Sequence, residues 1–169
     1  EEVQSVVQDI DSRSPEGGAR VVARAWMDAE FKALLLRDAT TACESMGFDM
    51  TAQDVKLVAV ENTPRVHNVV VCTLCSCYPR MLLGLPPAWY KSRAYRARVV
   101  SEPRAVLREF GLELPNDVAV RVHDSTADLR YLVVPMRPAG TERLSEAELV
   151  PLVTRDSMIG TAMLPPLKT

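Results

Sequence analysis

Several features that identify common functional classes are missing from this sequence of 169 residues. The formal net charge is only −2, so no overall positive field would attract nucleic acid. No apolar run is long enough to cross a bilayer, and no secretory leader is recognisable. No glycine-rich phosphate loop or Gly-x-Ser-x-Gly nucleophile elbow is present. These absences argue against nucleic acid, membranes and serine hydrolase chemistry, and the simplest expectation is a cytoplasmic protein.

Cysteine is scarce but concentrated in one place. Of four cysteines, three lie at Cys72, Cys75 and Cys77. A buried structural cysteine behaves as a small hydrophobic residue and needs no cysteine neighbours. Three thiolates that converge on one point form a soft ligand set for a metal ion. Cys43 lies in a helical pattern and is expected to be a packed thiol rather than a ligand.

The Cys-x-x-Cys-x-Cys spacing leaves several kinds of site open. A structural zinc site usually takes four ligands from two separated pairs, but Cys43, His67 and His123 all lie far from the trio in sequence. Iron–sulfur clusters use four cysteines at wider spacing. A disulfide or a redox Cys-x-x-Cys motif would leave the third thiol unexplained. The spacing favours a compact claw around one ion, with a redox site or inert packing as the alternative.

The sequence around the trio carries a more specific pattern. The claw is Val-Cys-Thr-Leu-Cys-Ser-Cys at 71–77, preceded by Glu-Asn-Thr-Pro at 61–64 and Val-His-Asn-Val-Val-Val at 66–71. Gly-Leu-Pro-Pro at 84–87, Trp-Tyr-Lys-Ser at 89–92 and Arg-Pro-Ala-Gly-Thr at 137–141 follow it. These segments resemble the alpha subunit of nitrile hydratase, and the similarity extends from about Gly18 to Ala162.

The resemblance implies an unusual metal centre. Cys72, Cys75 and Cys77 would supply three sulfurs, the backbone amides of Ser76 and Cys77 two nitrogens, and water or substrate the sixth position. Family members carry the residue at Cys75 as sulfinic acid and that at Cys77 as sulfenic acid. Thr73 matches the cobalt branch of the family, which makes Co(3+) the expected ion and iron the less expected one.

The resemblance also implies an activity, which is the hydration of a small-molecule nitrile to the amide. Cys75 and Cys77 would act at the reacting centre. Gln53 lies at the position of a family glutamine close to that centre. The family usually has a tryptophan where this chain has Arg80, and three interpretations stay open. Arg80 suits the pocket to a polar or larger nitrile, helps to neutralise the claw, or faces solvent.

A charge count predicts that this chain forms only part of the working site. Three anionic sulfurs and two amidates around a trivalent ion leave a charge near −2, which is costly without cations or donors facing it. In the family, arginines of the beta subunit supply them, and an activator protein is used for metal loading. Two alternatives remain: the gamma subunit of thiocyanate hydrolase, which yields carbonyl sulfide and ammonia, and a non-catalytic metal or redox module.

The order of the predicted elements indicates an α+β fold. The resemblance implies an N-terminal helical arm followed by a four-layer α-β-β-α globular domain. We divide the chain into 1–47, the arm and N-terminal helices, and 48–169, the α/β domain carrying the claw. Asp28 is expected to cap one helix that ends at Gly47. Strands are expected over 54–61 and 66–71, and a hairpin over 118–134 with its turn at 124–128.

Overall fold

The computed structural model describes residues 14–51 and 55–168, so residues 1–13, the first part of the predicted 1–47 segment, lie outside the described residues. The strands are β1 (Lys56–Glu61), β2 (Val66–Val71), β3 (Ala119–Asp124) and β4 (Leu129–Val134). The helices are α2 (Glu16–Met27), α3 (Ala29–Arg37), α4 (Ala39–Ser45), α5 (Arg80–Leu83), α6 (Ala88–Lys91), α7 (Arg93–Ser101), α8 (Pro103–Glu109), α9 (Glu146–Leu149) and α10 (Arg155–Ile159), with a 3-10 turn, η2 (Val150–Leu152).

The N-terminal helices begin and end at residues with clear physical roles. Asp28 caps α3, because its carboxylate accepts the N–H of Phe31 at 3.0 Å. The predicted single helix from Asp28 to Gly47 is wrong, since Asp38 interrupts it. The Asp38 side chain accepts the N–H of Thr41 at 3.1 Å and caps α4 as a separate helix. Gly47, with φ of 90°, follows the end of α4 as expected.

The four strands form two parallel pairs. β1 pairs with β4, from Lys56 opposite Leu129 to Glu61 opposite Val134. β2 pairs with β3, from Val66 opposite Ala119 to Val71 opposite Asp124. The predicted hairpin over 118–134 is therefore wrong, because its two strands join different pairs. Apolar alternation indicates a strand but does not identify its partner, and β3 and β4 each pair with a strand from earlier in the chain.

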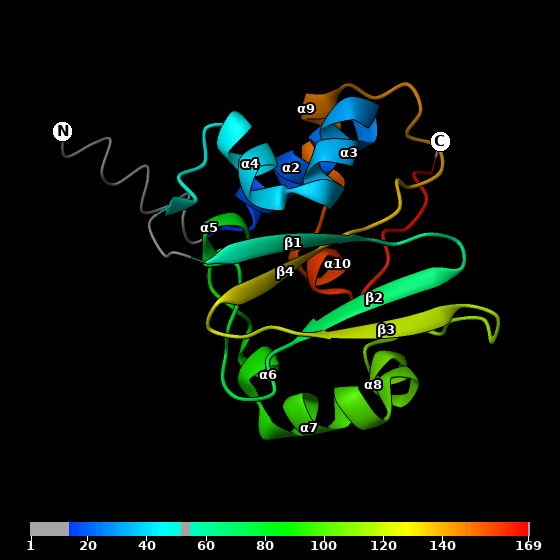
Figure 1. Ribbon diagram of the computed structural model, residues 1–169. Helices are drawn as coiled ribbons and strands as arrows, with labels where there is room; N and C mark the ends of the chain where they lie inside the picture. The colour runs from blue at the N-terminus through cyan, green and yellow to red at the C-terminus, as the bar shows by residue number, and fades with distance from the viewer. Residues whose placement is uncertain (1–13, 52–54, 169) are drawn as a thin grey trace.

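Helices flank these strands on two sides (Figure 1). α2, α3, α4 and α9 lie beyond β1, while α6, α7 and α8 lie beyond β3, and α10 contacts both β2 and β4. The α+β prediction is confirmed, whereas the stacking of four distinct layers and the boundary at residue 47 stay predictions. α3 and α4 pack directly on β1. Within the described chain, no helix has the length and apolar character needed to span a membrane.

The strand β2 positions the claw. Val69, Val70 and Val71 are buried, so packing on both faces fixes the backbone that leads into Cys72. Gly160, at the end of α10, crosses directly over this strand. A Cβ atom at Gly160 would overlap the carbonyl oxygen of Asn68, so only glycine allows this approach.

Candidate metal centre

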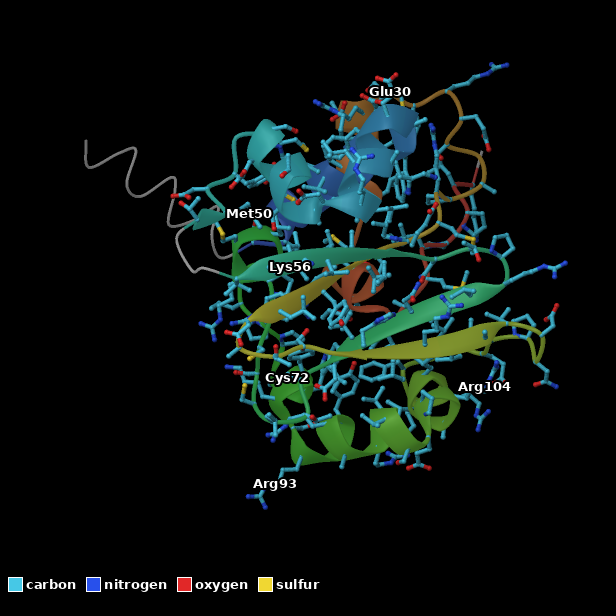
Figure 2. All side chains as sticks on the ribbon, viewed as in Figure 1. Glu30, Met50, Lys56, Cys72, Arg93 and Arg104 are labelled. Atoms are coloured by element: carbon cyan, nitrogen blue, oxygen red, sulfur yellow. The ribbon has the colours of Figure 1, made fainter. Side chains whose placement is uncertain are left out.

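The three clustered cysteines converge at the end of β2. Figure 2 labels Cys72 at this point, near α6. The Sγ atoms of Cys72 and Cys75 lie 3.4 Å apart, and those of Cys75 and Cys77 lie 3.1 Å apart. All three sulfurs lie within 4.8 Å of one another. Cys72 and Cys77 are buried and Cys75 is exposed, so the trio opens toward the surface at Cys75.

The distances fit one shared ion better than a disulfide. A disulfide bond is about 2.05 Å long, much shorter than either separation, and all three thiols are free. For a metal–sulfur bond of about 2.3 Å, two ligands at right angles are separated by about 3.3 Å. The separations of 3.1 and 3.4 Å lie on either side of that value. The donor set therefore fits a soft or borderline metal ion.

The thiols of Cys75 and Cys77 also differ in pKa. Hydrogen bonds from the thiol of Cys77, and then from that of Cys72, lower the pKa of Cys75 to about 7. Burial, and then the hydrogen bond with Cys75, raise the pKa of Cys77 to about 12, against a smaller lowering effect of Arg130. Burial thus disfavours the thiolate of Cys77, and a bound cation would stabilise that charged form.

The backbone amides within the claw face the same centre. The N–H of Cys75 donates to Cys72 Sγ at 3.3 Å. The N–H groups of Cys77 and Ser76 contribute smaller lowering effects to the pKa of Cys75, so both lie close to its sulfur. Among the described residues, neither of these two N–H groups donates to a backbone carbonyl in a turn, loop or helix cap. Sulfur and amide nitrogen therefore line one small volume.

Residues from distant segments hold the claw in place. The Asp124 carboxylate accepts from Thr73 twice, from its N–H at 2.9 Å and from its Oγ1 at 2.6 Å. Arg96 donates through Nη2 to the Thr73 carbonyl at 3.1 Å. The Tyr90 hydroxyl, fully buried, donates to the Cys77 carbonyl at 2.8 Å. The 124–128 segment, which the sequence assigns to a hairpin turn, thus begins with a support for the claw.

The sequence does not single out the aromatic residues beneath the claw. The basic residues spread over 89–100 would by themselves indicate a solvated or subunit-facing surface, but Tyr90 and Tyr95 are buried. Tyr95 donates to the Val70 carbonyl at 2.6 Å, and Tyr90 packs edge-on against Tyr78 with ring centroids 5.1 Å apart. The alternation of aromatic with charged residues in this segment could have indicated that one face of it is buried. A buried tyrosine usually has a hydrogen-bond partner for its hydroxyl, as both of these tyrosines do.

The other predicted site residues do not join the trio. Cys43 is buried in α4, and burial raises the pKa of its thiol to about 12, as expected for a packed thiol. His67 contacts the Gly160 carbonyl through Nε2 at 2.6 Å and Asn62 through Nδ1 at 3.4 Å, which supports a structural role. His123 is bonded to Asn68 at 2.8 Å. Gln53 lies outside the described residues.

Two arginines belong to, or contact, the segment that directly follows the claw. Arg80 follows Cys77 by three residues and is exposed. Arg130, on β4, donates through Nη1 to the Tyr78 carbonyl at 3.4 Å and through Nη2 to the Ala127 carbonyl at 3.2 Å. Its Nε is buried without a hydrogen-bond partner. The sequence alone does not point to Arg130, since a lone arginine within a strand pattern carries no functional signal.

Comparison with known proteins links this centre to a family. The sequence profile described as "Nitrile hydratase, alpha chain" matches residues 1–162. The chain is 58% identical over 149 residues to the low-molecular weight cobalt-containing nitrile hydratase subunit alpha of Rhodococcus rhodochrous, covering 88% of this chain and 72% of that protein. It is 43% identical over 167 residues to the thiocyanate hydrolase subunit gamma of Thiobacillus thioparus, covering 93% of this chain and 69% of that protein.

The fold leads to the same family. A solved structure of a double mutant of the Fe-type nitrile hydratase from Comamonas testosteroni Ni1 superposes with a TM-score of 0.87 at 49% identity, covering 90% of this chain and 74% of that chain. The profile match alone spans more than half of the sequence. This chain therefore belongs to the nitrile hydratase alpha-chain family.

Proposed function

We propose that this chain is the metal-bearing subunit of an enzyme that hydrates a nitrile to the corresponding amide at a Co(3+) centre. The observation that carries the proposal is the convergence of three sulfurs within 4.8 Å in a member of this family. Cobalt is favoured over iron because the relative that is 58% identical is named cobalt-containing, while the Fe-type structure is 49% identical.

The chain's own atoms would hold the ion in a defined way. Cys72, Cys75 and Cys77 supply the sulfurs, and the backbone nitrogens of Ser76 and Cys77 complete the protein ligands. The Tyr90 hydroxyl holds the Cys77 carbonyl, which orients the peptide group between Cys77 and Tyr78. A bound trivalent ion supplies Lewis acidity that polarises the C≡N bond.

Oxidation distinguishes the three sulfurs in this proposal. With dioxygen as the external oxidant, Cys75 would be oxidised by four electrons to a sulfinate and Cys77 by two electrons to a sulfenate, whereas Cys72 stays a thiolate. In the hydration, a water oxygen forms a bond to the nitrile carbon, and the two protons of water end on the nitrogen to give the amide. The attacking oxygen comes from water directly or from the Cys77 sulfenate, which water then restores. Gln53 is retained as an amide that orients groups at the site.

The site also calls for a partner. Proteins that match this chain are named as subunits, and we propose a hetero-oligomer in which a beta subunit supplies arginines to the oxidised sulfurs. Leu74, within the claw, supports this, because its side chain is apolar and yet 83% exposed in the chain alone. An exposed apolar residue of this kind is typical of a surface that a partner covers. An activator protein would assist metal loading. We place the complex in the cytoplasm, where reduced thiols persist until the metal is bound.

The experiment is an assay of the chain produced together with its beta subunit in cobalt-containing medium. Amide formation from a small nitrile is expected, with about one cobalt per chain. Cys75→Ser and Cys77→Ser are expected to abolish metal loading or turnover, while Cys43→Ala, the matched thiol outside the trio, leaves both intact. Full activity in the Cys75→Ser/Cys77→Ser double variant would refute the assignment.

Two outcomes of the same assay separate the alternatives. Carbonyl sulfide released from thiocyanate, without amide from nitriles, would indicate thiocyanate hydrolase activity. Bound metal without turnover of either compound, with the partner subunit present, would indicate a non-catalytic metal or redox module.

A further inference from the structure

Thr73, within the claw, is held at both ends by side chains of opposite charge. The Asp124 carboxylate accepts from the Thr73 N–H at 2.9 Å and from Thr73 Oγ1 at 2.6 Å. Arg96 donates to the Thr73 carbonyl through Nη2 at 3.1 Å and through Nε at 3.4 Å. The peptide groups on both sides of Thr73 are therefore fixed, and the first of them begins at Cys72. We call Asp124, Thr73 and Arg96 the Thr73 bracket.

The two charges of the Thr73 bracket have no other charge to balance them within this chain. Among residues 14–51 and 55–168, neither Asp124 nor Arg96 forms an ion pair. The remaining contact of Arg96 is neutral, from Nη1 to the Lys91 carbonyl at 3.5 Å. The bonds of one residue and the two hydrogen bonds keep the carboxylate and the guanidinium at most about 10 Å apart. This is close to the Debye length of about 8 Å, so the two charges offset each other across Thr73.

A carboxylate without such a balance would be unfavourable at this position. The proposed centre stays anionic even with a trivalent ion bound, by the charge count of its three sulfurs and two amidates. Asp124 is bonded to the residue that directly follows Cys72, the first sulfur ligand. Like charges at short range repel, and the repulsion grows when a partner subunit excludes water from the claw. A cation bonded to the same residue removes this penalty.

We propose that Arg96 is a positioning residue of the metal centre that also cancels the charge of Asp124. The Thr73 bracket then fixes the claw without adding negative charge to it. The inference rests on the proposed function, and it adds a cation from this chain to those expected from the partner subunit. Loss of Arg96 should harm the centre mainly by leaving Asp124 unbalanced, and removal of the Asp124 charge should repair part of that harm.

The test measures the cobalt concentration for half-loading of the complex and its sulfur-to-cobalt charge-transfer absorption. Arg96→Gln should raise the half-loading concentration about fivefold, the size expected for a partly exposed pair of charges. The absorption should move to longer wavelength, because less positive charge then stabilises the sulfur electrons. Arg96→Lys, which keeps the charge, should load at lower cobalt than Arg96→Gln. Adding Asp124→Asn to Arg96→Gln should reverse part of both effects, since asparagine keeps an oxygen that can accept the Thr73 N–H.

Arg93 provides the matched control. It lies on α7 with Arg96, and both line a shallow surface hollow of about 500 Å³ together with Thr73. The Arg93 side chain is exposed and points away from the fold (Figure 2), and within the described ranges it forms no ion pair. Arg93→Gln removes a positive charge from the same helix but leaves the Thr73 bracket intact. It should therefore change neither the half-loading concentration nor the absorption.

Each other outcome has a distinct meaning. Arg96→Gln/Asp124→Asn loading no better than Arg96→Gln would show that the bracket acts by geometry alone, which overturns the charge balance. Equal effects of Arg93→Gln and Arg96→Gln would assign the change to general surface charge and overturn it as well. Wild-type loading and absorption in Arg96→Gln would remove Arg96 from the centre while leaving nitrile hydration intact. A wild-type complex that takes up no cobalt and forms no amide would overturn the proposed function itself.

Discussion

Gly160 offers the sharpest test of how the strand that leads to the claw is held. Its φ is +100°, a conformation that costs an alanine about 1–2 kcal/mol. A Cβ atom there would also overlap the Asn68 carbonyl and lie 2.8 Å from the Cα of Val69. Because these neighbours are backbone atoms of β2, they cannot move aside cheaply. Overpacking of this kind adds about 1–3 kcal/mol or more.

Gly111 separates the two contributions. Its φ is +86°, but a Cβ atom would meet nothing within 4 Å. Gly111→Ala should therefore cost only the backbone strain of about 1–2 kcal/mol, and Gly160→Ala that strain plus the overlap. Urea unfolding of both variants measures the difference, with unchanged m-values as the condition for comparing midpoints. If the two variants lose the same stability, then α10 does not cross β2 as closely as described.

Three further predictions concern the claw and its surroundings. Tyr90→Phe leaves the Cys77 carbonyl buried without its donor and should lower the unfolding free energy by about 1–3 kcal/mol; urea unfolding that matches the wild type would contradict the hydrogen bond. Asp124→Ala removes both bonds to Thr73 and should lower the cobalt content of the complex, measured by elemental analysis; full loading would show that the claw holds its shape unaided. Burial lowers the pKa of His67, against the opposing effect of its bond to Gly160, so the folded state binds fewer protons than the unfolded chain below about pH 6.5. The free energy of unfolding should therefore fall as the pH drops below that value, and His67 contributes at most about 1.4 kcal/mol per pH unit to this fall. Unfolding curves at several pH values should show a shallower pH dependence for His67→Gln than for the wild type. Equal slopes in the two proteins would assign the pH dependence to other residues.

The sequence predicts the parts of the site that lie close together along the chain. Cys72, Cys75 and Cys77 fall within six positions, so local geometry alone brings their sulfurs together. The strand before them is a run of valines that packing buries on both faces. The cap at Asp28 is equally local, and it is also confirmed.

The sequence does not predict what depends on pairing across long distances. Asp124 and Thr73 meet only because β3 lies parallel to β2, and the turn-forming residues after Asp124 suggested a hairpin instead. Arg130 reaches the claw because β4 pairs with β1, again in parallel. Parallel pairs leave no short turn signal between the paired strands, so apolar periodicity cannot identify their partners.

The metal content and the intact mass of the purified complex together show whether the claw binds the ion. We expect about one cobalt per chain and a mass increase of three oxygen atoms, two on Cys75 and one on Cys77. Replacement of Cys72 by serine should remove the metal and the added oxygens together. A chain that carries no metal after loading with its partner, or cobalt that persists when all three cysteines are replaced, would contradict the claw as the site of the ion.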